Sequence, residues 1–288
     1  MSTIIDFLLN IISSITDFIL PIFVFLLVLN VGLSQDLSQV WQTVKKDWRY
    51  MAGLAAINYL LVPFLIHWTL PLIGAPAAIE AGFLLYFMTC GAPVSVAFID
   101  AADNDDKFGG VVMLVMVVVM MIFLPVAMPF FIDGLSVPIG QLFANIAQSI
   151  LIPLLIGLAI NYFSSTTAKK IQAYIAPANS IMLDIVIYGN IIANIPQIIG
   201  LLGTGTLAYA AVMNILIMVA SYFIFFRRSE GKQQIAAQMT GMRNAGISML
   251  LASTNFQNPD VLMIIVVISS IGTVLVQFAS QIFAKIDS

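Results

Sequence analysis

Long runs of apolar residues, separated by short polar segments, set the pattern of this 288-residue chain. Most runs are about 20 residues long, which is the length of helix that crosses about 30 Å of hydrocarbon. They do not show the strict alternation of transmembrane barrel strands. The pattern predicts an all-α polytopic membrane protein with nine spans, at 17–34, 50–70, 77–99, 109–132, 138–163, 173–197, 205–227, 234–255 and 261–284.

Residues 1–16 precede the first run and are too short to cross the membrane as a full-length span. Four polar residues recur there at helical spacing on one face: Asp6, Asn10, Ser13 and Asp17. Such a face predicts a short helix in the membrane interface. A shortened tenth span is the alternative.

The basic residues predict the orientation of the spans. Apart from Arg243, every Lys and Arg falls in connections on one side of the predicted bilayer: Lys45, Lys46, Arg49, Lys107, Lys169, Lys170, Arg227, Arg228, Lys232 and Lys285. By the positive-inside rule that side is the cytoplasm. We therefore expect a multi-pass protein of the cell membrane, with the C-terminus inside and the N-terminal helix outside.

Composition agrees with this picture and excludes several classes of protein. The chain is 61% hydrophobic and 9% charged, with a mean hydropathy of +1.04, whereas soluble domains carry about 25% charged residues. A single cysteine, Cys90, excludes an internal disulfide and a cysteine-based zinc cluster. A pI near 4.9 offers no basic surface for nucleic acid. We expect no cofactor and no metal site.

Two of the predicted spans are interrupted. The span 77–99 contains Cys-Gly-Ala-Pro at its middle, and the span 234–255 is interrupted from Gly241 to Gly246. Proline lacks a backbone donor, and glycine permits sharp turns. Inside a membrane, broken helices are tolerated where protein or a watery cavity surrounds them. A matched pair of interrupted helices indicates the binding site of a transporter, and ordinary kinks are the alternative.

Four segments carry a family resemblance: "FILPIFVFLLVLNVGLS" (18–34), "NYLLVPF" (58–64), "ILIPLLIGLAINYF" (150–163) and "GMRNAGISMLLA" (241–252). They resemble helices of the bile acid:sodium symporter family, the last of them its second crossing helix. The resemblance implies a panel domain, a core domain and two inverted repeats, 17–132 and 138–284. Each repeat would contain one broken crossing helix, with breaks near 90–95 and 241–246. It also implies secondary transport of organic anions by alternating access, usually driven by sodium.

The chain departs from the family at the residues that would bind sodium. The family has a glutamate two residues before the glycine of the crossing motif, and here that residue is Met239. The family's glutamine before the asparagine is Arg243, and Asn58 replaces a glutamine of the second sodium site. The first break keeps only Ser95, and the next helix offers the apolar stretch 113–119. Because hard cations need oxygen ligands, we expect altered or no sodium coupling, with conventional sodium symport as the alternative.

Arg243 is the leading candidate for substrate binding. Its guanidinium stays charged, and free backbone donors and half-helix ends at a break favour an anion. A bidentate contact with a carboxylate, sulfonate or phosphate follows. The alternative is a structural arginine paired with Asp184 or with capping carbonyls. The predicted substrate-binding residues are Arg243, Asn244, Thr240, Ser248, Cys90, Ser95 and Asn58.

Asp184 lies near the middle of the span 173–197 and carries a second set of alternatives. A buried carboxylate could carry a coupling proton, or it could be the permanent partner of Arg243. An intramembrane protease would need a pair of acids, a Ser/His pair or a metal motif, and His67 lacks such a partner, so no enzyme is expected. We expect a secondary transporter of a small organic anion, carboxylate, bile-acid-like or pantothenate-like, with sodium or a proton as candidate coupling ion.

Overall fold

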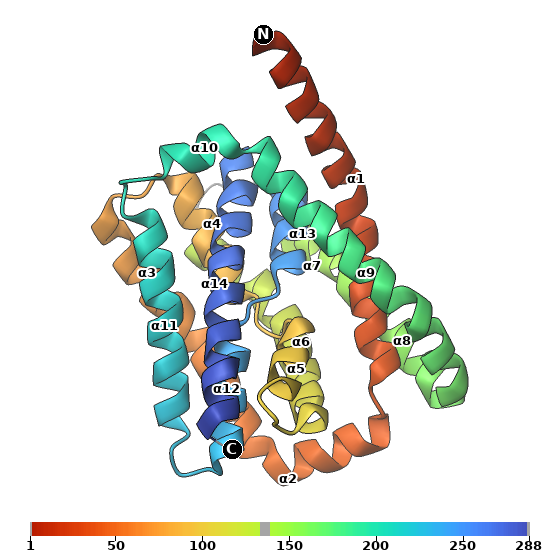
Figure 1. Cartoon of the computed structure of the whole chain (residues 1–288). Helices are drawn as coiled ribbons and strands as arrows, with labels where there is room; N and C mark the ends of the chain where they lie inside the picture. The colour runs from red at the N-terminus through yellow and green to blue at the C-terminus, as the bar shows by residue number, and fades with distance from the viewer. Residues whose placement is uncertain (1, 133–138, 287–288) are drawn as a thin grey trace.

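The computed structural model describes residues 2–132 and 139–286, and every regular element in these ranges is a helix (Figure 1). In chain order the elements are α1 (Ser2–Ser34), α2 (Leu37–Ala56), η1 (Ile57–Leu61), α3 (Val62–Thr69), η2 (Leu70–Ile73), α4 (Ala77–Met88), α5 (Val94–Asp100), α6 (Asp106–Phe131), α7 (Ile139–Ile146), η3 (Ala147–Leu151), α8 (Ile152–Phe163), α9 (Ser165–Ala193), α10 (Ile195–Gly200), α11 (Thr206–Ile224), α12 (Glu230–Gly241), α13 (Ala245–Asn255) and α14 (Pro259–Ile286). The elements η1 and η3 are π-helical turns, and η2 is a 3-10 turn.

Seven helices in the described part of the chain are long and apolar enough to cross a membrane. They cover Leu9–Ser34, Leu37–Ile73, Asp106–Phe131, Phe143–Phe163, Ser165–Ala193, Thr206–Ile224 and Pro259–Lys285. The other two predicted spans, 77–99 and 234–255, are each divided in two by a break. None of the four half-helices is long enough to span the hydrocarbon core alone. The count of nine spans therefore stays a prediction, and the predicted start of the second repeat at residue 138 lies outside the described residues.

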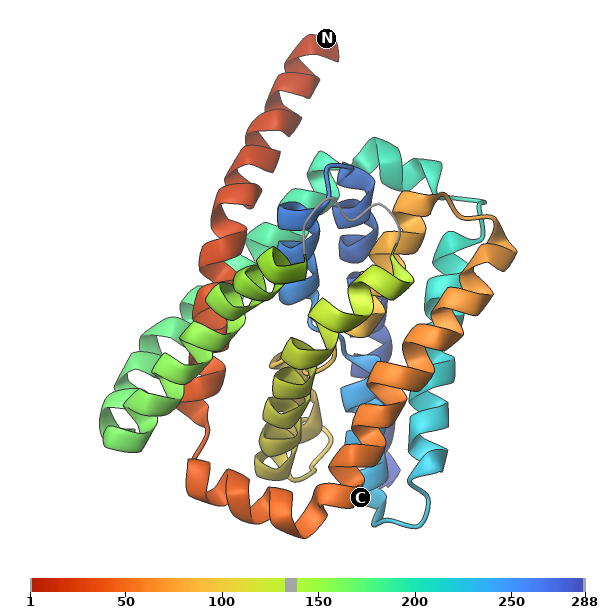
Figure 2. The ribbon, with the colours of Figure 1, turned by 180° about the vertical axis from the view of Figure 1, so that it is seen from behind.

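The predicted boundary before residue 17 is not present in the structure. Residues 2–16 belong to α1, a single helix of 33 residues that also contains Pro21. No glycine occurs in the chain before Gly32, and the hydroxyl of Ser13 donates a hydrogen bond to Asp17 within the helix (3.5 Å). Figures 1 and 2 show that the N-terminal part of α1 projects beyond the other helices.

Helices α1, α8 and α9 form a layer at one side of the molecule, which we call the three-helix layer (Figure 1). Gly32 of α1 lies directly against Gly157 of α8. A Cβ atom added to Gly157 would clash with the carbonyl oxygen of Leu29 and would lie 2.8 Å from the backbone nitrogen of Leu33. Small residues let membrane helices approach this closely. The two glycines therefore fix the spacing of the layer.

The remaining helices form a bundle around α4, which is buried along almost its whole length from Ile79 to Met88. A helix that is apolar on all sides belongs in the interior. The half-helix α12 differs, because polar side chains are buried along it. Gln238 donates hydrogen bonds to the carbonyl of Phe98 (2.8 Å) and to Ser280 (2.9 Å). These bonds connect α12 to α5 and α14.

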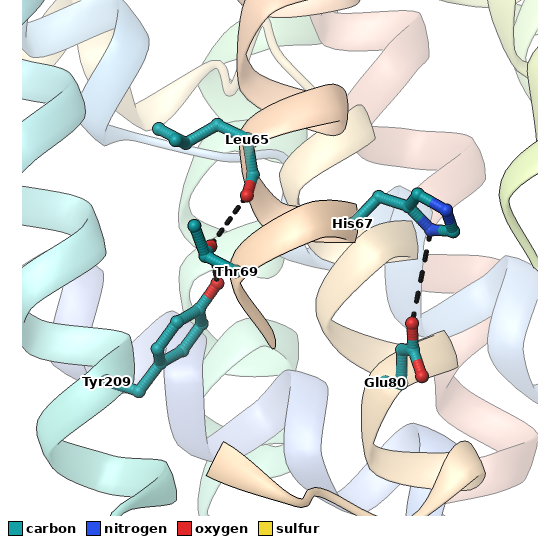
Figure 3. A network of polar contacts seen from close by, with 5 residues as sticks. All are labelled: Leu65, His67, Thr69, Glu80 and Tyr209. Carbon is teal, nitrogen blue, oxygen red and sulfur yellow. Dashed lines mark hydrogen bonds and ion pairs between the residues drawn. The ribbon is translucent and has the colours of Figure 1, made fainter. Parts of the chain in front are cut away.

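The connections that carry the basic residues lie at one end of the molecule. Figure 1 places α2, the α11–α12 connection and the C-terminus at its lower end, which we call the basic end. At the opposite end, polar contacts tie α3 to α4 and α11 (Figure 3). Thr69 donates to the carbonyl of Leu65 (2.6 Å) and lies 2.7 Å from the hydroxyl of Tyr209, and His67 Nδ1 lies 4.0 Å from Glu80 Oε1. Which end faces the cytoplasm stays a prediction.

Candidate functional site

The two interrupted helices meet at their breaks. The helices α4 and α5 are separated by residues 89–93, and α12 and α13 by a second short extended segment. Cys90 and Arg243 pair there as an isolated antiparallel bridge. The backbone N–H of Asn244 donates to the carbonyl of Thr89 (2.8 Å). Both breaks therefore lie within the predicted spans 77–99 and 234–255, and a backbone hydrogen bond joins them.

Glycine at the first break is required by the backbone. Gly91 has φ = +91°, a conformation that side chains with a Cβ rarely adopt. A Cβ there would also lie 3.0 Å from the backbone nitrogen of Val117 and 3.1 Å from the carbonyl of Met113 on α6. Pro93, which follows, lacks an N–H donor and immediately precedes α5. The sequence Gly-Ala-Pro thus ends one half-helix and starts the next.

Asn244 connects the two breaks through its side chain as well. Its Oδ1 accepts the backbone N–H of Ile247 (3.2 Å), which caps the start of α13. Its Nδ2 donates to the carbonyl of Gly91 (3.3 Å). Only 2% of Asn244 is exposed. Asparagine is among the best helix-capping residues, so the structure supports the capping role, and a role toward substrate stays a prediction.

Arg243 is fully buried, with 0% of its surface exposed. Its Nε, Nη1 and Nη2 atoms donate no hydrogen bond to the described residues. The guanidinium carbon lies 5.6 Å from the ring centroid of Phe87. The ionisable groups that interact with it electrostatically among the described residues are Cys90, Tyr86 and Tyr59, and none of these is a carboxylate. A buried cation without a counter-charge is costly in a membrane.

The ends of four half-helices meet around this cation. The helices α4 and α12 end at the crossing, and α5 and α13 begin there. Carbonyl groups at helix C-termini carry partial negative charge, which favours a cation. Phe87 belongs to the last turn of α4, so the guanidinium lies near a negative helix end. Transporters with broken helices use such C-terminal ends for cations and the N-terminal ends for anionic groups.

A chain of hydrogen bonds joins two further predicted residues. Asn58 Nδ2 donates to the carbonyl of Leu54 (2.9 Å) and to Thr240 Oγ1 (3.2 Å). Thr240 in turn donates to Ser221 Oγ (3.0 Å). All three polar side chains are fully buried. The chain links η1, α12 and α11, as hydrogen bonds between membrane helices commonly do.

Two of the other predicted residues, Ser95 and Cys90, contact Met239, which is fully buried. Ser95 donates to the carbonyl of Ala92 (2.6 Å) and lies 3.5 Å from the sulfur of Met239. The thiol of Cys90 contacts the carbonyl of Met239 (3.4 Å). Ser248 bonds within its own helix, to the carbonyls of Asn244 (3.1 Å) and Ala245 (3.0 Å). A thioether thus occupies the position at which the resemblance places a carboxylate.

Asp184 does not pair with Arg243 in the structure. It lies exposed on α9 in the three-helix layer. The ion pairs among the described residues are His67 with Glu80 and Lys232 with Asp47. The guanidinium extends instead toward Phe87 in the central bundle. The interpretation of Asp184 as the static partner of Arg243 is therefore corrected, because the two side chains belong to different layers.

A small cavity of about 100 Å³ lies between the three-helix layer and the crossing. Its lining includes Leu183 and Ile187 of α9, and the starts of α5 and α13 at residues 92–94 and 243–246. Ser269 and Thr273 of α14 complete the polar part of its wall. The cavity therefore meets the half-helices at their N-terminal ends, which favour anions.

Sequence reasoning missed several residues of this site. Tyr86 and Phe87 lie in the last turn of α4, just before the first break. Their closeness to the break in the sequence could have identified them as site residues. Tyr59 donates to the carbonyl of Met116 (2.6 Å) and contacts that of Cys90 (3.5 Å). No sequence signal links Tyr59 to a break so distant in the chain. The long-range packing of η1 against α4 brings them together.

Comparisons with known proteins add family information to this geometry. The profile of the Sodium Bile acid symporter family matches residues 21–201. An uncharacterized sodium-dependent transporter of Bacillus subtilis strain 168, YocS, is 24% identical over 245 residues, covering 82% of this chain and 74% of the relative. The probable sodium/metabolite cotransporter BASS5 of rice chloroplasts (Oryza sativa subsp. indica) is 22% identical over 241 residues. That match covers 80% of this chain and 60% of the rice protein, which is less than two thirds of its length.

The match covers most of the chain, from the middle of α1 through α10, and includes the first broken helix. Members of the family are membrane transporters and not enzymes. The apolar helices of this structure agree with a multi-pass membrane protein. The chain belongs to the sodium bile acid symporter family.

Proposed function

We propose that this protein transports a small organic anion by alternating access, and that the guanidinium of Arg243 replaces a coupled sodium ion. One observation carries the proposal: a fully buried guanidinium lies at the crossing of two broken helices without a carboxylate partner. In this position the cation is part of the chain. Its charge is therefore present whether or not sodium is bound.

The surroundings of Arg243 disfavour sodium. Two unit charges 4 Å apart repel by about 4 kcal/mol at an effective dielectric constant of about 20. Sodium also needs several hard oxygen ligands, as other hard cations do. Here Met239 supplies a thioether, and the buried stretch facing Gly91 on α6 contains Met113 and Val117. These residues support a transporter whose sodium coupling is weakened or lost.

The substrate would bind in the small cavity between the three-helix layer and the crossing. The N-terminal ends of α5 and α13 border it, and Arg243 and Asn244 are among its lining residues. A carboxylate there would receive helix-end stabilisation and the field of the guanidinium behind it. The sequence predicts a direct bidentate contact between the guanidinium and the substrate. That contact would require the cavity to extend to the buried side chain of Arg243. A carboxylate, bile-acid-like or pantothenate-like, is the substrate class that we propose.

The proposed architecture completes this mechanism. We propose two inverted repeats, 17–132 and 138–284, with the three-helix layer as the panel and the surrounding bundle as the core. The basic end would lie in the cytoplasm, in line with the positive-inside rule. Movement of the bundle against the layer would open the cavity alternately to the two sides.

The second candidate function is a conventional sodium:organic anion symporter. It is favoured by the Bacillus relative, whose name describes a sodium-dependent transporter. The first proposal includes a variant in which Asp184, the residue after the cavity-lining Leu183 in the chain, carries a coupling proton. The three coupling modes differ in which gradient the flux requires.

The test measures binding and flux in defined salts. Purified protein is screened by thermal shift against small carboxylates, including pantothenate, with taurocholate as the large member. The best ligand is then titrated in sodium chloride and in choline chloride. We expect the same affinity in both salts, and uptake into proteoliposomes that continues without a sodium gradient. An affinity that rises steeply with sodium, or flux that stops without it, would establish the conventional symporter instead.

A further inference from the structure

The first part of α2 lies across the basic end of the molecule and joins the three-helix layer to the bundle (Figures 1 and 2). Asp36 caps its start by accepting the backbone N–H groups of Ser38 (2.8 Å) and Gln39 (3.4 Å). The helix is kinked at Asp47, which has φ = −116° and ψ = 23°. We call residues 37–46 the lateral segment. Beyond the kink the chain continues through η1 into α3.

The kink is held by an ion pair with the second broken helix. Lys232 Nζ of α12 lies 2.5 Å from Asp47 Oδ1. The carbonyl of Lys232 accepts the hydroxyl of Tyr50 (2.9 Å), and its ammonium group lies 4.7 Å from the ring centroid of Phe108. The direction of the lateral segment is therefore fixed against α12.

The lateral segment has two different faces. On one face, Val40 and Val44 are half-buried and pack against the core. Gln39, Thr43 and Lys46 line a polar cavity of about 560 Å³ that the starts of α6 and α12 complete. The remaining face is exposed and aromatic. Trp41 is 61% exposed, and Trp48, just past the kink, is 57% exposed.

Each of these two tryptophans lies beside a cation. Lys45 Nζ lies 4.6 Å from the ring centroid of Trp41, and Arg49 Cζ lies 5.4 Å from that of Trp48. Neither cation forms an ion pair with the described residues. The acids on the same helix are engaged elsewhere, since Asp36 caps the helix and Asp47 binds Lys232. The surface formed by Trp41, Lys45, Trp48 and Arg49, here the aromatic–basic surface, thus has unbalanced positive charge.

We propose that the aromatic–basic surface binds the headgroups of anionic phospholipids at the membrane surface. Indole rings prefer the boundary between headgroups and hydrocarbon, where their apolar body and polar N–H are both accommodated. Lys and Arg beside them attract anionic lipids from the surrounding bilayer. A second copy of the chain is a poorer occupant, because a symmetric contact would bring four cations together.

Trp68 provides an internal control, because the chain has three tryptophans in total. It lies on α3, past the kink and η1, and is 72% exposed. Its ring contacts Phe64, with centroids 5.9 Å apart. No Lys or Arg stacks on it among the described residues. Trp68 should therefore contact lipid without selecting its charge.

The experiment uses quenching of tryptophan fluorescence by brominated lipids. The variant Trp68→Phe reports on the aromatic–basic surface, and Trp41→Phe combined with Trp48→Phe reports on Trp68. Each is reconstituted in phosphatidylcholine vesicles with a fixed minor fraction of brominated phosphatidylglycerol or brominated phosphatidylcholine. For the first variant, we expect quenching by the anionic lipid to be about threefold stronger than by the zwitterionic lipid. For the second, the two lipids should quench equally.

Removing the cations separates charge from simple exposure to lipid. Adding Lys45→Gln and Arg49→Gln to the Trp68→Phe background should abolish the preference for the anionic lipid and leave the quenching by brominated phosphatidylcholine unchanged. Equal quenching by both lipids in the Trp68→Phe variant would overturn the proposal. Resistance to both lipids would also overturn it, and would indicate a protein partner or a second copy on this surface.

Discussion

Two close backbone contacts in this protein differ in the residues that form them. In the three-helix layer, α1 and α8 meet at Gly32 and Gly157, where no side chain intervenes. At the crossing, Cys90 and Arg243 pair through their main chains, and the arginine side chain is buried beside them. In the first contact both helices are continuous. In the second, both helices are broken and each break bonds to the other.

This difference distinguishes a contact with a structural role from a candidate functional site. The glycine contact depends on close packing of two backbones and buries no charged group. The crossing leaves a cation without a carboxylate, and Asn58 Oδ1 and Tyr86 OH without a hydrogen-bond partner among the described residues. Such groups cost stability in a membrane. They are the groups expected to interact with a transported solute.

The largest effect is expected at the glycine contact. Leucine at position 157 would clash with backbone atoms of α1, which cannot move as a flexible side chain would. The change Gly157→Leu should lower the free energy of unfolding by about 3 kcal/mol, at the upper end of overpacking effects. Unfolding of detergent-solubilised protein measures this. Gly140→Leu is the control, because its Cβ would have no neighbour within 4 Å. Equal losses in both variants would contradict a tight α1–α8 contact.

A smaller effect is expected at the crossing. Asn244→Ala removes the cap of α13 and the bond to Gly91, and should cost about 2 kcal/mol. Asn244→Ser can still cap the helix but cannot reach Gly91 in the same way, so it should cost about half as much. Unfolding measurements on both variants test this order. A loss in Asn244→Ser as large as that in Asn244→Ala would show that the bond between the breaks, and not the cap, dominates.

The sequence predicted the breaks but could not predict what surrounds Arg243. Proline and glycine have local effects on the backbone, so residues 90–93 and the Gly241–Gly246 segment could be identified from spacing alone. The neighbours of Arg243 depend on which helices pack together. From the sequence, Asp184 was only an alternative charge partner for Arg243, whereas the folded chain places Phe87 beside the guanidinium. Helical spacing shows which residues share a face, and not which helix that face contacts.

The lateral segment shows a related limit of prediction from the sequence. Residues 37–46 fall between predicted spans, and their sequence reads as a charged connection. In the structure they are helical, because Asp36 caps the segment and Val40 and Val44 pack against the core. The continuous α1 is the opposite case, since one polar face suggested a boundary that backbone geometry did not require.

The smallest effect is expected for a polar pair outside the crossing. Tyr209 and Thr69 are hydrogen-bonded to each other, and Thr69 also donates to Leu65 (Figure 3). Tyr209→Phe should therefore cost about 1 kcal/mol of stability and leave ligand affinity unchanged. Tyr174→Phe, at a site that is 82% exposed, is the matched control and should change neither. A fall in ligand affinity in Tyr209→Phe would extend the functional region beyond the crossing.

The central claim is that Arg243 supplies the fixed charge for anion binding, and it is tested most directly by the affinity of Arg243→Gln. The best carboxylate ligand of the wild-type protein is titrated against both proteins in sodium and in choline salts. The account predicts a folded variant with 10- to 100-fold weaker binding in both salts, roughly the effect of losing one charge-assisted interaction. Arg243→Lys, which keeps the charge, should restore part of the affinity. Unchanged affinity in well-folded Arg243→Gln protein would contradict the account.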